Sequence, residues 1–177
     1  MEIREATAAD LAQITAIYNS IVRTSTAIYN DQPVTLEDRE TWWRARLAQR
    51  YPVIVAVDDT DILGYGSFGD FRPWPGYRFT VEGTVHIREG DRGKGIGTRL
   101  LNELVDRARV LGKHVMVAGV DSENTASLRF LTARGFVSAG QLREVGFKFG
   151  RYLHLNFLEL FLNAPGELPG QLNQPKT

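Results

Sequence analysis

The 177-residue sequence contains no cysteine. This absence excludes disulfide bonds, thiolate metal sites and a cysteine nucleophile, so any chemistry has to proceed without a thiol from the chain. The three histidines, His86, His114 and His154, lie far apart and have no second ligand type at metal-binding spacing. We therefore predict no metal site.

The sequence also lacks an excess of either charge and any long apolar run. It has 21 Lys and Arg residues against 21 Asp and Glu residues, so no overall positive field draws it to nucleic acid or to an anionic membrane. No uncharged apolar stretch approaches the roughly 20 residues of a membrane span, and residues 1–10 show no apolar core of a signal peptide. These features favour a cytoplasmic protein whose partner is a small molecule or another protein, with no nucleic acid and no membrane.

What is present indicates one globular domain. Hydrophobic residues make up 43% of the chain, which is enough for a substantial core. We expect the domain to span residues 1–162, and residues 163–177, with three prolines, to form a flexible tail. Hydrophobic periodicity predicts a mixed α/β fold in the order β-α-α-β-β-β-α-β-α-β-β. The expected strands are 3–6, 52–57, 62–70, 77–88, 114–120, 136–143 and 152–162, and the expected helices are 7–21, 35–50, 96–111 and 124–134.

A glycine-rich segment, residues 90–97, joins an extended strand to an amphipathic helix. Closely spaced glycines before a helix offer unpaired backbone N–H groups and a positive helix end, which together bind phosphate. The Walker motif fails because Gly95 is followed by Ile96 and not by lysine. The Rossmann motif fails because Thr98 stands where its last glycine is required. The segment is therefore a candidate for a different phosphate ligand.

The spacing Arg92-x-x-Gly95-x-Gly97 resembles the pyrophosphate loop of the GNAT acetyltransferases. A second motif, Asn124-Thr-Ala-Ser127 followed by Arg134-Gly-Phe136, is similar to the family segment along the pantetheine arm. Within the family the chain is most similar to the phosphinothricin and methionine sulfoximine or sulfone N-acetyltransferases, in the segments 16–19, 26–29, 64–67, 71–74, 79–82, 92–97, 114–117 and 146–151. The resemblance reaches to about Leu162. It implies a central, mostly antiparallel sheet flanked by helices, acetyl-CoA as cosubstrate, and a homodimer.

The resemblance also assigns residues to the cofactor. Backbone groups of the strand before the glycine loop would hold the thioester end and supply an N–H for the oxyanion, the loop would hold the pyrophosphate, and the second motif would line the pantetheine. The implied cofactor-binding residues are Val85, His86, Ile87, Arg92, Gly93, Lys94, Gly95, Ile96, Gly97, Thr98, Asn124 and Ser127.

Glu82 is the candidate general base. An alkyl ammonium has to lose a proton before its nitrogen can attack a thioester. Glu82 lies on the strand that leads to the glycine loop, where the resemblance places the catalytic glutamate. The plainer interpretation is an exposed strand residue. With no cysteine and no evident Ser-His-Asp arrangement, we expect direct transfer through a ternary complex.

Substrate contacts are expected from a proline- and aromatic-rich stretch. Arg72 is suited to a bidentate clamp on a substrate carboxylate, although a loop arginine is more commonly a solvated charge. Pro73, Trp74 and Tyr29 would form walls of the pocket.

Two positions depart from the family pattern. Leu131 stands where relatives carry a tyrosine or histidine that protonates the leaving thiolate, so the general acid is unassigned. Phe149 stands where phosphinothricin enzymes carry a histidine, which favours the methionine sulfoximine or sulfone type. Two alternatives stay open: an acetyltransferase for another amine, such as a polyamine, an aminoglycoside or a protein amine, and a sensor that binds acetyl-CoA without turnover.

Overall fold

The structure of the protein, a computed structural model, describes residues 1–166. In this part of the chain seven strands form one sheet in the order β1-β2-β3-β4-β5-β7-β6. All neighbouring strands are antiparallel except β4 and β5. The strands are β1 (Glu2–Glu5), β2 (Val53–Asp58), β3 (Asp61–Asp70), β4 (Thr80–Ile87), β5 (Val115–Asp121), β6 (Val137–Lys148) and β7 (Arg151–Phe161). The predicted mixed, mostly antiparallel sheet is confirmed.

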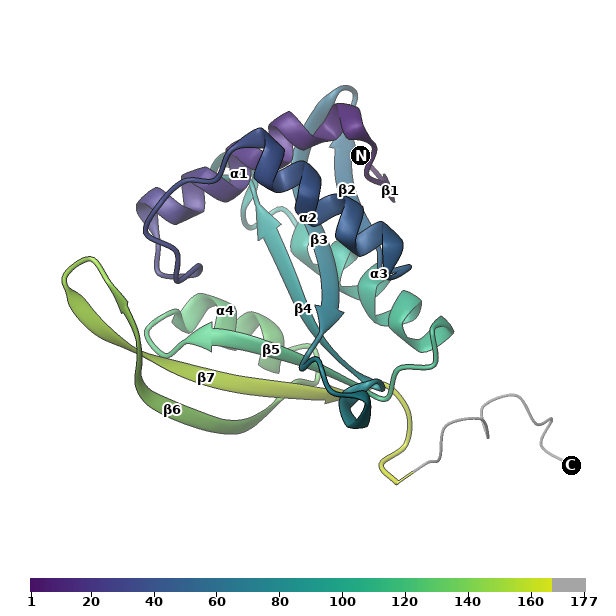
Figure 1. Cartoon of the computed structure of the whole chain (residues 1–177), viewed down its shortest axis with the longest axis vertical. Coiled ribbons are helices and arrows are strands. Elements are labelled where there is room, and N and C mark those ends of the chain that lie inside the picture. Colours follow the sequence, from purple (N-terminus) through teal and green to yellow (C-terminus); the bar gives the residue numbers. More distant parts are fainter. Residues whose placement is uncertain (167–177) are drawn as a thin grey trace, which may run out of the picture.

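Helices cover both faces of this sheet (Figure 1): α1 (Leu11–Thr24), α2 (Leu36–Ala48), α3 (Ile96–Val110) and α4 (Thr125–Thr132). The alternation of side chains along β2 separates the two faces. Val53 and Val55 pack with Ile14 of α1, whereas Ile54 packs with Leu104 of α3. The order of strands and helices along the chain is the predicted one.

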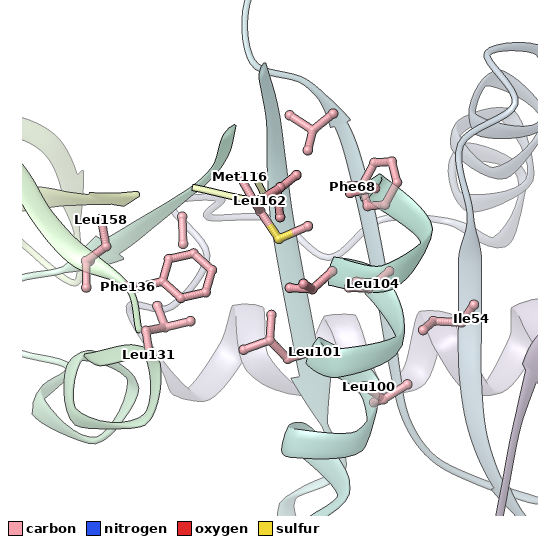
Figure 2. Close-up of a cluster of buried hydrophobic side chains, with 14 of the residues drawn as sticks. Ile54, Phe68, Leu100, Leu101, Leu104, Met116, Leu131, Phe136, Leu158 and Leu162 are labelled. Carbon is pink, nitrogen blue, oxygen red and sulfur yellow. The ribbon is translucent and has the colours of Figure 1, made fainter. Parts of the chain in front are cut away.

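The apolar face of α3 fixes that helix on the sheet. Leu100, Leu101 and Leu104 point from α3 into the larger core cluster, close to Met116 of β5 (Figure 2). All four are at most 4% exposed, and burying one leucine of this kind contributes about 2 kcal/mol. The first turn of α3 is therefore held firmly beside the end of β4.

The two N-terminal helices begin at capping boxes. Before α1, the backbone N–H of Thr7 donates to the Asp10 carboxylate at 2.7 Å, and Arg4 donates to the same carboxylate at 2.7 Å. Hydrogen bonding from Arg4 lowers the pKa of Asp10 to about 2. Before α2, the backbone N–H of Thr35 donates to the Asp38 carboxylate at 2.8 Å, and the backbone N–H of Asp38 donates to Thr35 Oγ1 at 3.1 Å. A short 3-10 turn, Ala8–Asp10, separates Thr7 from α1.

The sheet opens between β4 and β5. These two strands pair only where Thr80–Glu82 lies beside Val115–Val117. Beyond that point β4 continues along β3 to Ile87, and β5 continues along β7 to Asp121. Figure 1 shows the two strands diverging. Each strand therefore has one edge that faces the gap without a strand partner, and the polar backbone groups on those edges are open to a ligand.

Some element boundaries differ from the prediction. The strand expected from residue 77 begins only at Thr80, because Pro75–Tyr77 forms a 3-10 turn. The strand expected to end at residue 143 continues as β6 to Lys148, and a tight turn with positive φ at Phe149 and Gly150 leads into β7. Of the expected tail, residues 167–177 lie outside the described part. Within residues 1–166 no helix has both the length and the apolar composition that a membrane span requires.

Candidate active site

Two pockets meet at the gap between β4 and β5. The first, here named the α2 pocket, has a volume of about 440 Å³ and lies on the α1 and α2 face. The second, the α4 pocket, has a volume of about 120 Å³ and is lined by Val85, Met116 and the first turns of α4. Five residues line both pockets: Ala27, Thr84, His86, Gly119 and Asp121. A molecule in one pocket can therefore meet a molecule in the other through the gap.

Glu82 stands at the start of the gap. It is the last residue of β4 that pairs with β5, and its half-buried side chain lines the α2 pocket. A Cβ atom at Gly119 would lie 3.3 Å from Glu82 Oε1, so the glycine leaves room for the carboxylate. Among residues 1–166 no group donates a hydrogen bond to that carboxylate. Burial raises the pKa of Glu82, and the charges of Arg72 and Arg46 oppose this rise. A half-buried carboxylate with free oxygens can accept a proton from a ligand.

His86 lies further along β4 and borders both pockets. Burial lowers its pKa to about 4, with smaller contributions from the charges of Arg39 and Arg92. The imidazole is therefore neutral near pH 7, and its ring packs against Tyr65 with centroids 5.3 Å apart. Val85, beside it, lines the α4 pocket, whereas Ile87 lines neither pocket.

The glycine loop precedes α3 in the predicted position. Gly93 and Gly95 have φ values of 78° and 81°, which favour glycine, and a Cβ at either would meet no atom within 4 Å. Gly95 is the N-cap of α3, and the first-turn N–H groups of a helix have no partner within the helix. Open space before a helix N-terminus fits the phosphate groups of acetyl-CoA.

Of the other residues assigned to the cofactor, Arg92 is exposed and four contact other parts of the protein. Lys94 Nζ donates a hydrogen bond to Asp91 at 2.8 Å and so stabilises the loop. Thr98 accepts a hydrogen bond from Arg134. Ile96 is 3% exposed and belongs to the core. A Cβ at Gly97 would lie 3.3 Å from the Phe130 ring, so this glycine permits close packing of α3 against α4.

Asn124 and Ser127 begin α4 on the wall of the α4 pocket. Asn124 is the N-cap, and its Oδ1 accepts from the backbone N–H of Ser127 at 3.1 Å. Leu131, one turn on, is buried and lines the same pocket (Figure 2). No acid stands at that position.

The residues predicted to contact substrate fall into two groups. Tyr29 lines the α2 pocket with Glu82, and its hydroxyl donates to the His154 carbonyl at 3.1 Å. Burial, together with the charge of Asp121, raises the pKa of Tyr29 to about 12. Arg72, Pro73 and Trp74 are exposed and line neither pocket.

Arg72 nonetheless lies near the mouth of the site. Its guanidinium lies 4.3 Å from the centroid of the Phe71 ring and donates to the Phe71 carbonyl at 3.0 Å. The positive charge of Arg72 nonetheless lowers the pKa of Glu82 and opposes the effect of burial.

Sequence reasoning missed two arginines and one aspartate. Arg39 and Arg46 of α2 line the α2 pocket together with Trp42. The spacing of positions 39, 42 and 46 places all three on one helix face, a signal that was available in the sequence. Asp121, 2% exposed, accepts a hydrogen bond from Thr26 and borders both pockets. Within residues 1–166 no cluster of three or more His, Asp or Glu residues is arranged to hold a metal ion.

Comparisons with known proteins identify the family to which the chain belongs. Residues 14–136 match the model of the Acetyltransferase (GNAT) family. The chain is 48% identical over 168 residues to the L-methionine sulfoximine/L-methionine sulfone acetyltransferase of Pseudomonas paraeruginosa, covering 94% of this chain and 98% of the relative. It is 42% identical over 160 residues to the phosphinothricin N-acetyltransferase of Alcaligenes faecalis, covering 88% of this chain and 79% of the relative.

A solved structure also identifies the chain as an acetyltransferase. The yncA acetyltransferase of Salmonella typhimurium, determined with its cofactor acetyl-CoA, has a TM-score of 0.91 and 45% identity, covering 96% of this chain and 98% of that one. The family match spans more than half of the chain, and the identities extend over nearly all of it. The chain therefore belongs to the GNAT family of acetyltransferases and is an acetyl-CoA-dependent N-acetyltransferase.

Proposed function

We propose that the acceptor is a small amino acid of the methionine sulfoximine, methionine sulfone or phosphinothricin kind, acetylated on its α-amino group with Glu82 as general base. The observation that carries this proposal is the half-buried Glu82 carboxylate, which lines the α2 pocket where the β4–β5 gap begins and receives no hydrogen bond from any group of residues 1–166. The names of the two relatives support the choice of acceptor. The arginines of the α2 pocket support an acceptor that carries negative charge.

Acetyl-CoA, when bound, supplies the thioester that the free amine attacks. We propose that it is held by the glycine loop, residues 92–98, by the backbone at 85–87, and by Asn124 and Ser127. Glu82 removes the ammonium proton, directly or through water, and so frees the nitrogen lone pair. A backbone N–H of residues 85–87 donates to the oxyanion. The new amide bond replaces the thioester bond in one transfer. Because Leu131 has no proton to donate, the thiolate leaves unprotonated or takes its proton from water.

The carboxylate of the acceptor is assigned to Arg72, with Tyr29, Pro73 and Trp74 as neighbouring contacts. An α-carboxylate lies close to the amine that Glu82 deprotonates. Arg72 is one of the two cations whose charge reaches Glu82, which supports this role. A guanidinium offers two parallel N–H donors to a carboxylate.

The assay that tests the proposal measures thiol release from acetyl-CoA with a panel of amines. The panel contains methionine sulfone, methionine sulfoximine, phosphinothricin, spermidine and an aminoglycoside. We expect turnover with the first three and little with the cationic amines. Turnover of only the cationic amines would assign another acceptor class, and acetyl-CoA binding without turnover of any amine would identify a sensor.

We also propose a cytoplasmic homodimer that binds neither nucleic acid nor membrane. The balanced charge of the chain supports the last two points. Apolar side chains on β6, β7 and the turn between them are 46–64% exposed, namely Val137, Leu142, Val145, Phe147, Phe149 and Tyr152. Because β6 is an edge strand, a second copy would cover both this surface and the strand edge. Sedimentation of Phe147→Ser protein is expected to give monomer where wild type gives dimer.

A further inference from the structure

Arg39 is a buried cation without a counter-charge among the residues that the structure describes. It is 6% exposed and lies in the first half of α2, on the wall of the α2 pocket. Among residues 1–166 no carboxylate pairs with it and no oxygen accepts from it, and its Nε is buried without a partner. A guanidinium removed from water in this way is unfavourable unless an anion or another acceptor completes the site.

Two aromatic rings hold the Arg39 side chain in place. The guanidinium carbon lies 3.9 Å from the centroid of the Tyr18 ring and 4.7 Å from that of the Trp42 ring. Cation–π contacts of this kind offset part of the cost of burial and fix the plane of the group. They leave the N–H donors along its edge unused. The side chain is therefore pre-positioned for a ligand with oxygen acceptors.

Arg39 and Glu82 occupy different parts of the α2 pocket. Burial raises the pKa of Glu82, and the charges that oppose the rise are those of Arg72 and Arg46. Burial lowers the pKa of His86, and there the charge of Arg39 adds to the effect. Ring contacts place Arg39 at the His86 end of the pocket: its guanidinium lies over the Trp42 ring, Trp42 packs against Tyr65, and Tyr65 packs against His86. Arg46 lies at the Glu82 end, because a Cβ on Gly69, the strand neighbour of Glu82, would meet its guanidinium.

This separation indicates which part of an amino acid Arg39 can reach. The acceptor amine has to lie beside Glu82, and its α-carboxylate is attached only one carbon away from the nitrogen. The α-carboxylate is therefore bound by the cations near Glu82, which are Arg72 and Arg46. The far end of the side chain, several bonds further on, is the part that extends to the other side of the pocket.

We propose that Arg39 is a specificity-determining residue whose guanidinium donates hydrogen bonds to oxygen atoms on the acceptor's side chain, such as those of a sulfone, sulfoximine or phosphinate group. The proposal rests on the proposed function and extends it from the reacting amine to the remote end of the substrate. Tetrahedral sulfur and phosphorus groups present adjacent oxygens, which suit the paired donors of a guanidinium.

The test compares methionine sulfone with methionine, which has the same carbon chain and no oxygen on sulfur. kcat/KM is measured for both in wild type, in Arg39→Met and in Arg39→Lys, at saturating acetyl-CoA. The matched control is Arg44→Met, on the same helix but 70% exposed and paired only with Glu40. Wild type and the control should prefer the sulfone. Arg39→Met should lower kcat/KM for the sulfone roughly 10- to 100-fold, the range for a hydrogen bond to a charged group. It should change the value for methionine less than about threefold, and the KM for acetyl-CoA should not move.

Three outcomes would overturn the proposal. The first is an equal loss for both acceptors in Arg39→Met, which would make Arg39 a packing residue. The second is a wild type that does not prefer the sulfone. The third concerns Arg39→Lys and is needed if thermal melting shows that Arg39→Met does not fold. Arg39→Lys keeps the charge but loses the planar guanidinium, so it should weaken the preference for the sulfone. An unchanged preference would contradict the proposal. Failure of the proposed function is distinguishable, because wild type would then acetylate neither amino acid.

Discussion

The two pockets on either side of the β4–β5 gap are built from different parts of the chain. The proposed cofactor side comprises the α4 pocket and the glycine loop before α3, and its polar groups depend on backbone geometry: two glycines with positive φ, the first turn of α3 and the Asn124 cap of α4. The α2 pocket depends on side chains from separate elements, with Arg39 and Arg46 on α2, Glu82 on β4 and Asp121 on β5. The proposed cofactor side thus relies on backbone groups, and the acceptor side relies on side chains with specific chemistry.

This difference separates two tasks. Backbone N–H groups bind phosphate and carbonyl oxygens whatever the neighbouring side chains are, so we expect the proposed cofactor side to tolerate sequence change except at the glycines. The acceptor side can change its substrate when one side chain is replaced. Variants on the two sides should therefore fail in different ways, and the predictions below use that contrast.

The largest effect is expected for Glu82→Gln, on the acceptor side. Loss of the base should lower kcat by roughly ten- to ten-thousand-fold near neutral pH, with the size depending on whether water can take the proton. Calorimetry should give an unchanged Kd for acetyl-CoA. A variant that loses cofactor affinity to the same degree as rate would show that Glu82 supports the fold of the gap and does not act as the base.

A variant on the cofactor side should show the opposite pattern. Gly95→Val places a β-branched side chain at a φ of 81°, which is strained and obstructs the approach of phosphate to the backbone. We expect the Kd for acetyl-CoA to rise by roughly 100-fold or more. Gly90→Val is the matched control, because Gly90 lies in the same segment without a positive φ and with open space around it. Equal affinities for the two folded variants would contradict the phosphate-loop assignment.

Arg72→Ala should give a smaller effect that depends on the acceptor. If Arg72 holds the carboxylate, the KM for methionine sulfone should rise by roughly 10- to 100-fold, as for a hydrogen bond between charged groups. The KM for the decarboxylated amine of the same shape should change little. An equal rise for both amines would remove Arg72 from carboxylate recognition.

The contrast between the two sides also explains which parts of the site can be predicted from the sequence. The glycine loop and the start of α4 are short contiguous motifs, so the order of residues alone predicts their position. The spacing of Arg39, Trp42 and Arg46 on one helix face is visible in the sequence, but only the packing of α2 over the sheet buries Arg39 and half-buries Arg46. Glu82 is an intermediate case. Its strand is predictable from the sequence, but its place at the opening follows from the divergence of β4 from β5, which is a long-range feature.

The hairpin formed by β6 and β7 shows a second limit of sequence reasoning. Lys148 ends β6 and is 1% exposed, with its Nζ donating to the carbonyls of Ser25 and Ile28 at 2.7 Å each. A lysine at a strand end normally faces solvent, so the burial of Lys148 could not be predicted from the sequence. The loop of residues 25–32 that it holds lines the α2 pocket through Ala27, Ile28 and Tyr29. This loop therefore borders the site, and its anchor could be seen only in the folded chain.

The most direct test of Glu82 as the base is the pH dependence of kcat/KM in wild type and in Arg46→Met. Glu82 acts as a carboxylate, so kcat/KM should fall as the pH drops through its pKa, which burial raises above the ordinary value. The charge of Arg46 opposes that rise, so its removal should move the acidic limb of the profile to higher pH. Arg44→Met, an exposed charge on the same helix, should leave the limb in place. A limb at the same pH in wild type and in Arg46→Met would contradict the assignment of Glu82 as the base.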